Sequence, residues 1–137
     1  MNDFEIIDHT ADIGIVAYGD DVGELFINAA RGMISIITDT RNVAEAIRQD
    51  IDIEAENQAE LLVAWLNELL YLFDAENLIF SRFEMLDIGE TNLKAIAFGE
   101  HFDLARHEIK SQIKAATYHM LKLEKTERFK AQVILDV

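Results

Sequence analysis

The chain has 137 residues, of which 50% are hydrophobic, carries a formal net charge of −14 and contains neither cysteine nor proline. This length and composition predict a single domain spanning residues 1–137 with a proper hydrophobic core, and they exclude a disordered chain. The lack of cysteine excludes disulfides, thiolate metal sites and cysteine nucleophiles. No apolar run is long enough to span a membrane, and the N-terminus is acidic where a secretory signal would be basic, so we expect a soluble, cytoplasmic protein.

The charge is distributed unevenly. Residues 1–103 carry 22 acidic and 5 basic side chains, whereas residues 104–137 carry 4 acidic and 7 basic ones. Because an acidic body repels polyphosphate, direct nucleic-acid binding is not expected. The basic C-terminal part is either a solvated hairpin or a surface for a phosphate or an acidic partner. The acidic body suits a protein partner that is itself basic.

The first half of the chain predicts strands and two amphipathic helices. Loose alternation indicates strands at Phe4–Ile7 and Ile13–Tyr18. Capping signals, followed by apolar residues every three or four positions, predict helices over 21–37 and 57–73. Between them, 43–55 has a period of two, as a half-exposed strand does.

The second half predicts mainly hairpin-linked strands. Leu78–Met85 and Leu93–Phe98 flank a polar segment that is typical of a hairpin turn. We expect a surface loop over 99–112, followed by alternating strands at Ile113–Leu123 and Phe129–Val137. Together these elements predict an α+β fold, a two-layer sandwich in which a mixed, mostly antiparallel sheet packs against the two helices.

The most polar motif is Asp8-His9-Thr10-Ala11-Asp12, which lies where a strand begins and shortly before Gly14. Two interpretations are open. One is a turn in which Asp8 or Thr10 caps backbone groups and Gly14 relieves a bend. The other is a functional site.

Carboxylates are the remaining candidates for chemistry, because the sequence has no glycine-rich phosphate loop, no Gly-x-Ser-x-Gly elbow and no His-Glu-x-x-His zinc motif. Asp12 lies at a predicted strand start, and Asp136 with the terminal carboxylate of Val137 lies at a strand end. If these strands are neighbours, three anionic groups converge and need a hard cation such as Ca²⁺ or Mg²⁺. The sequence leaves open whether the two ends meet.

The segments His9-Thr10-Ala11-Asp12-Ile13-Gly14, Lys114-Ala115-Ala116-Thr117-Tyr118-His119 and Asp136-Val137, in this order, resemble the archease family over essentially the whole chain. The resemblance implies a small cytoplasmic, non-enzymatic cofactor protein that promotes the guanylylation and turnover of the tRNA-splicing RNA ligase. It also implies a bound divalent cation, usually calcium, with Asp12, Asp136 and Val137 as ligands.

Further residues of the motifs have expected roles at this tip. Lys114, Tyr118 and His119 are expected to support the tip or to meet the partner, and His9 either is a ligand or shapes the turn. This sequence departs from the family pattern at two positions where the family often has proline, which would stiffen the backbone. The chain ends Leu135-Asp136-Val137 where the family often has Pro-Asp-Ile, and Ile109 stands where proline is common. Neither departure removes a carboxylate.

Two other functions stay open on the sequence. One is a general chaperone-like adaptor for RNA-modifying enzymes. The other is a small metal-dependent hydrolase or isomerase, with Asp12 and Asp136 as ligands and His9 or His119 as the base.

Overall fold

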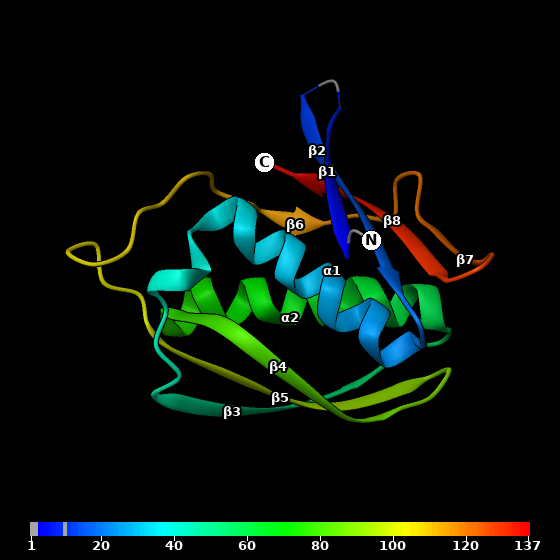
Figure 1. The fold of residues 1–137 in the computed structure, drawn as a ribbon, viewed down its shortest axis with the longest axis horizontal. Helices are drawn as coiled ribbons and strands as arrows, with labels where there is room; N and C mark the ends of the chain where they lie inside the picture. Colours follow the sequence, from blue (N-terminus) through cyan, green and yellow to red (C-terminus); the bar gives the residue numbers. More distant parts are fainter. Residues whose placement is uncertain (1–2, 10) are drawn as a thin grey trace.

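The computed structural model describes residues 3–9 and 11–137 (Figure 1). The elements follow one another as β1 (Phe4–His9), β2 (Asp12–Gly19), α1 (Val22–Ile37), the 3₁₀ helix η1 (Thr40–Asn42), β3 (Ile47–Glu54), α2 (Gln58–Glu76), β4 (Leu78–Ile88), β5 (Asn92–His101), β6 (Ala115–Ala116), β7 (Lys122–Lys125) and β8 (Phe129–Asp136).

The strands form two sheets, and the two long helices lie between them (Figure 1). One sheet has the order β1-β2-β8-β6, with β7 also paired to β8, and the other has the order β3-β5-β4. All of the pairings within the described residues are antiparallel. The predicted α+β fold with two amphipathic helices is therefore confirmed. The sequence predicts one sheet, whereas the strands of the structure are divided between two sheets.

Both helices begin where the capping signals predict. The Asp21 carboxylate accepts a hydrogen bond from the Glu24 N–H (2.8 Å), and the Asn57 side chain accepts one from the Glu60 N–H (2.9 Å). α2 ends at Asn77, whose left-handed backbone (φ 59°) stops the helix. No helix within the described part of the chain is long and apolar enough to cross a membrane.

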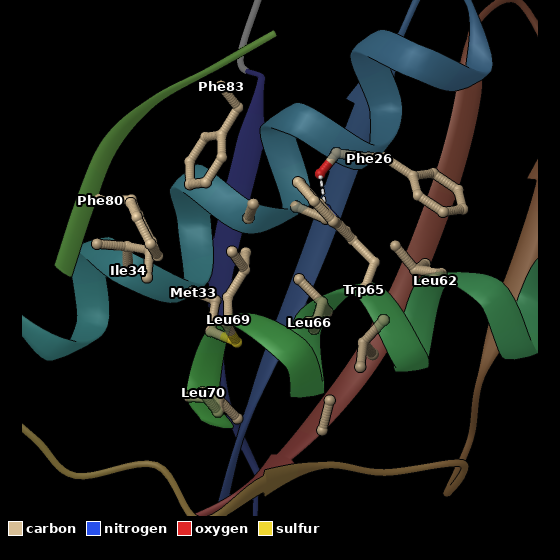
Figure 2. Packing of buried hydrophobic residues seen from close by; sticks show 14 of the residues in the cluster. Phe26, Met33, Ile34, Leu62, Trp65, Leu66, Leu69, Leu70, Phe80 and Phe83 are labelled. Carbon is tan, nitrogen blue, oxygen red and sulfur yellow. Dashed lines mark hydrogen bonds between the residues drawn. The ribbon is translucent and has the colours of Figure 1, made fainter. Parts of the chain in front are cut away.

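The core is one continuous cluster to which both helices and both sheets contribute. Trp65 of α2 is fully buried at its centre and donates its indole N–H to the carbonyl oxygen of Phe26 on α1 (2.9 Å). Phe80 and Phe83 of β4 close the same cluster from the second sheet (Figure 2). The hydrogen bond from Trp65 thus joins the two helices to each other, and the shared core packs both of them against the two sheets.

The strand predicted over Ile113–Leu123 is wrong in its extent. Within it, Ala115–Ala116 pairs with β8 as the short strand β6, and Lys122 and Leu123 pair with β8 as the start of β7. Between these two strands the chain turns through Met120, whose backbone is left-handed (φ 51°). The turn itself has no glycine, asparagine or proline to mark it.

Other predicted boundaries shift by a few residues. The strand expected from residue 43 begins at Ile47, because residues 43–46, which follow η1, are irregular. β5 continues to His101 and so extends into the expected loop. The rest of that loop is irregular, but it is not simply a surface segment, since His107 is buried.

Glu100, near the end of β5, fastens this irregular connection to the body of the protein. Its Oε2 accepts the N–H of Ala44 (2.7 Å) and lies 3.0 Å from Nε2 of His107, while Arg106 pairs with Oε1. Nδ1 of His107 accepts the N–H of Asp103 (2.9 Å), so the proton of a neutral imidazole is on Nε2. The N–H of Ala44, helped by Arg106 and His107 against the effect of burial, lowers the pKa of Glu100 from 4.5 to about 2.

Gly99 lies at a point where two strands come too close for a side chain. It pairs with Phe80 of β4, directly before a register shift in that strand. A Cβ at this position would lie 1.9 Å from the carbonyl oxygen of Ile79. The obstacle is main chain, so it cannot be relieved by rotating a side chain.

We therefore expect Gly99→Ala to lower the free energy of unfolding by roughly 3 kcal/mol or more. The control is Gly14→Ala in β2, where the nearest atom would be the side-chain end of Ile134 at 3.3 Å, and the expected cost is about 1 kcal/mol or less. Urea unfolding followed by the fluorescence of Trp65 measures both. Equal costs would show that the close approach is not a constraint.

A second prediction concerns acid stability. Because Glu100 has a pKa of about 2 in the folded protein and an ordinary value of 4.5, the unfolded chain takes up the proton first as the pH falls. Its contribution is complete above about pH 4.5 and disappears toward about pH 2. The stability advantage of the wild type over Glu100→Gln should therefore shrink as the pH falls from about 4.5 to about 2 in urea unfolding.

The control for this prediction is Glu108→Gln, an exposed position on the same segment. Its stability should follow that of the wild type through the same pH range. A constant difference between the wild type and Glu100→Gln would contradict the prediction.

Candidate functional site

The pairing of β2 with β8 brings Asp12 next to Asp136. The register pairs Ile13 with Leu135, and one further step along both strands sets Asp12 opposite Asp136. On the outer sides, His9 pairs with Asp12 and Ala115 pairs with Asp136. The condition on which the predicted cation site depended, that the two strands are neighbours, is met.

The two aspartates also share one face of the sheet. Ile15 and Ala17 of β2 and Val133 and Leu135 of β8 are buried in the core. Since successive side chains alternate between faces, Asp12 and Asp136 lie on the face away from the helices. Side chains directly opposite each other in an antiparallel pair have Cβ atoms about 5 Å apart. We call this end of the sheet, formed by Asp12, Asp136 and Val137, the acidic tip.

The acidic tip is open to solvent. Asp136 is exposed, Asp12 is half-buried and Val137 is 38% exposed. Within the described part of the chain, neither aspartate has a basic side chain at ion-pairing distance. Two neighbouring carboxylates without a positive partner repel each other, and a bound cation relieves that repulsion.

The donor set fits a hard cation. In the described residues, no group of three or more His, Cys, Asp or Glu side chains is placed to hold a metal. The sequence predicts the terminal carboxylate of Val137 as a third ligand beside the two aspartates. All three groups supply oxygen, which Ca²⁺ and Mg²⁺ prefer. Cation binding stays a prediction.

Of the other motif residues, Lys114 lies closest to the tip along the backbone. Its N–H donates to the carbonyl oxygen of Asp136 (2.7 Å), while its side chain is exposed. Tyr118 and His119 are exposed on the turn that follows β6. Thr117 anchors that turn by donating its hydroxyl to the carbonyl oxygen of Ile134 (2.8 Å).

The turn between β1 and β2 is shorter than the polar motif from which the sequence predicts it. Asp8 belongs to β1 and Gly14 to β2, so Gly14 does not relieve a bend; it lies in a buried strand position. Thr10 and the side chain of His9 lie outside the described residues, and their predicted roles are not tested. Ala11 is described, and its backbone is left-handed (φ 67°).

The chain is similar in sequence to known proteins over nearly its whole length. The model of the archease protein family matches residues 4–137. The chain is 41% identical to the protein archease of Methanosarcina mazei, over 98% of this chain and 95% of that protein. It is 40% identical to the protein archease of Pyrococcus furiosus over the full length of both.

Two solved structures have a similar fold. The solution structure of Methanobacterium thermoautotrophicum protein 1598 has a TM-score of 0.88 and 39% identity, and the comparison covers 100% of both chains. The crystal structure of an archease from Thermotoga maritima, described as a possible chaperone, has a TM-score of 0.65. At 22% identity, over 96% of this chain and 94% of that one, the second likeness shows the fold alone.

The left-handed alanine at the tip predicts a stabilising substitution. A side chain in this conformation costs about 1–2 kcal/mol, so Ala11→Gly should raise the free energy of unfolding by about 0.5–1 kcal/mol. Ala64→Gly, inside α2, is the control and should lower it by about 1 kcal/mol. Chemical denaturation of both variants is the measurement, and a loss of stability in Ala11→Gly would contradict the prediction.

Proposed function

The chain belongs to the archease family, and on that premise we propose that it is a cytoplasmic, non-enzymatic activator of the tRNA-splicing RNA ligase. The observation that carries the proposal is the adjacency of Asp12 and Asp136 at the open end of a sheet. The protein promotes guanylylation and turnover of the ligase, and its acidic tip is the part that acts on the partner.

The acidic tip holds a divalent cation in this proposal, most simply Ca²⁺, with Mg²⁺ as the alternative. Asp12, Asp136 and the carboxylate of Val137 are its ligands. When bound, such an ion supplies positive charge to phosphate oxygens of a nucleotide or to carboxylates of the partner. The chain's own residues fix where that charge is presented, and Lys114, Tyr118, His119 and His9 support the tip or contact the ligase.

The charge distribution supports a protein partner over direct nucleic-acid binding. With 22 acidic against 5 basic side chains in residues 1–103, most of the chain repels RNA. The same charge attracts the basic surface that an RNA-handling enzyme uses for its substrate. An acidic tip with a cation at its end suits the entrance of such an enzyme's active site.

One sizeable hollow lies far from the candidate ligands, so it gives no support to a hydrolase that would use them. A hollow of about 600 Å³ is lined by Asp21–Glu24, Ile27 and Met85–Ile88. It lies at the start of α1, beyond the end of β2 opposite to Asp12. A substrate held there would be the length of a strand away from the candidate ligands.

A single-turnover guanylylation assay with ligase, GTP and limiting Ca²⁺ tests the proposal. Asp12→Asn and Asp136→Asn should each reduce the stimulation at least about tenfold, the usual scale for perturbing a metal site. Asp52→Asn makes the same change in charge at an exposed position of β3, and it should stimulate like the wild type. Calorimetric titration of the isolated proteins with Ca²⁺ should show binding in the wild type and in Asp52→Asn only.

Full stimulation of the ligase by Asp12→Asn would show that the acidic tip is not needed for activation. It would favour the second candidate, a chaperone-like adaptor for RNA-modifying enzymes, which has one specific support in the description of the Thermotoga maritima archease as a possible chaperone. Metal-dependent phosphoester cleavage by the protein without ligase would instead favour a hydrolase.

A further inference from the structure

β6 is the element that flanks Asp136 on the side away from β2, and it is only two residues long. Ala115 and Ala116 pair with Asp136 and Leu135. The N–H groups of Lys114 and Thr117 extend the attachment by donating to the carbonyl oxygens of Asp136 (2.7 Å) and Ile134 (3.0 Å). So short a strand at the edge of a sheet needs support on its other side.

Asn67 of α2 gives that support. The N–H of Ala116 donates to Oδ1 of Asn67 (2.8 Å), and Nδ2 of Asn67 donates to the carbonyl oxygen of Ala116 (3.1 Å). A side-chain amide carries one acceptor and donors in nearly the spacing of a peptide group. Asn67 therefore acts on Ala116 as a neighbouring strand would, and both backbone groups at the edge of the sheet are satisfied.

Asn67 can hold β6 in place because α2 is itself held in the core. Its neighbours Trp65, Leu66 and Leu69 are completely buried, and Trp65 is also hydrogen-bonded to α1. The side chains of Figure 2 show this face of α2 packed into the core. Asn67 is a half-buried polar side chain next to that face, so it links the helix layer between the two sheets to β6.

From β6 the link continues to the last residues of β8. Chain ends fray unless they are tied down, and the pairing with β2 reaches Leu135 while the pairing with β6 reaches Asp136. We infer that Asn67 is a positioning residue for the acidic tip: through Ala116 it fixes the backbone of Asp136 and so the place of its carboxylate. This inference rests on the proposed role of Asp136 as a ligand.

The molecule contains a matched control in Asn28 of α1. Its Nδ2 donates to the carbonyl oxygen of Tyr18 on β2 (2.8 Å), and the residue is 3% exposed. Like Asn67, it joins a helix to the main chain of the same sheet by an amide. Tyr18, however, lies near the end of β2 that is far from Asp12. Loss of Asn28 should weaken the fold without loosening the tip.

The experiment compares Asn67→Ala and Asn28→Ala with the wild type by hydrogen exchange and by Ca²⁺ titration of the isolated protein. In the metal-free protein, Asn67→Ala should raise the exchange rate of the amides of Ala116, Leu135 and Asp136 at least tenfold relative to Asn28→Ala. Its dissociation constant for Ca²⁺ should rise about tenfold, whereas that of Asn28→Ala stays at the wild-type value even if its melting temperature falls further. Asn67→Leu keeps the side-chain volume without either hydrogen-bonding group and is the second variant if Asn67→Ala does not fold.

Two results would overturn the inference: unchanged exchange at Leu135 and Asp136 in Asn67→Ala, or an equal loss of Ca²⁺ affinity in Asn28→Ala. A wild type that binds no Ca²⁺ is a separate result. It would defeat the cation in the proposed function, while faster exchange at the end of β8 in Asn67→Ala would still support the positioning of Asp136.

Discussion

The antiparallel pairing of β2 with β8 is the interaction on which the rest of the molecule depends. It joins a strand near the start of the chain to the last strand. The larger sheet can therefore form completely only after nearly the whole chain has folded. The same register buries Ile15, Ala17, Val133 and Leu135 in the core. A slip by one residue would turn those side chains to solvent and bring the aspartates into the apolar layer. The hydrophobic core therefore enforces the adjacency of Asp12 and Asp136.

The two neighbouring carboxylates of the acidic tip repel each other and so destabilise the folded protein locally. Asp12 and Asp136 lie together without a basic side chain within the described residues, and Ala11 beside them has a left-handed backbone. Some other acidic groups have basic partners: Arg128 pairs with Asp20 and Glu24, and Arg106 pairs with Glu100. Two neighbouring carboxylates beside a strained backbone position are the kind of local conflict expected of a functional site.

The sequence predicts the local features of this fold well and the non-local ones poorly. The helices follow from their caps at Asp21 and Asn57 and from apolar periodicity, since both signals lie within a few residues of each other. Asp12 and Asp136 can be chosen as candidates from their residue types and from the family motif. The division into two sheets, the burial of His107 and the breaking of the 113–123 segment depend on partners outside the segment itself. Asn42, for example, lies 65 residues before His107, and Asn67 lies 49 residues before Ala116. No local pattern encodes these contacts.

Asn67 shows how such a non-local role arises and which signal it leaves. In the sequence it is a polar residue beside the apolar stripe of its helix, a position that is equally typical of a solvent-facing side chain. Its role becomes visible only when the fold sets β6 against α2 and leaves one backbone N–H and one C=O to be satisfied. The helix layer then has two tasks: it fills the space between the sheets, and it holds the edge of the sheet that carries the candidate ligands. A substitution in the core that tilts α2 would reach the acidic tip by this route, without touching a carboxylate.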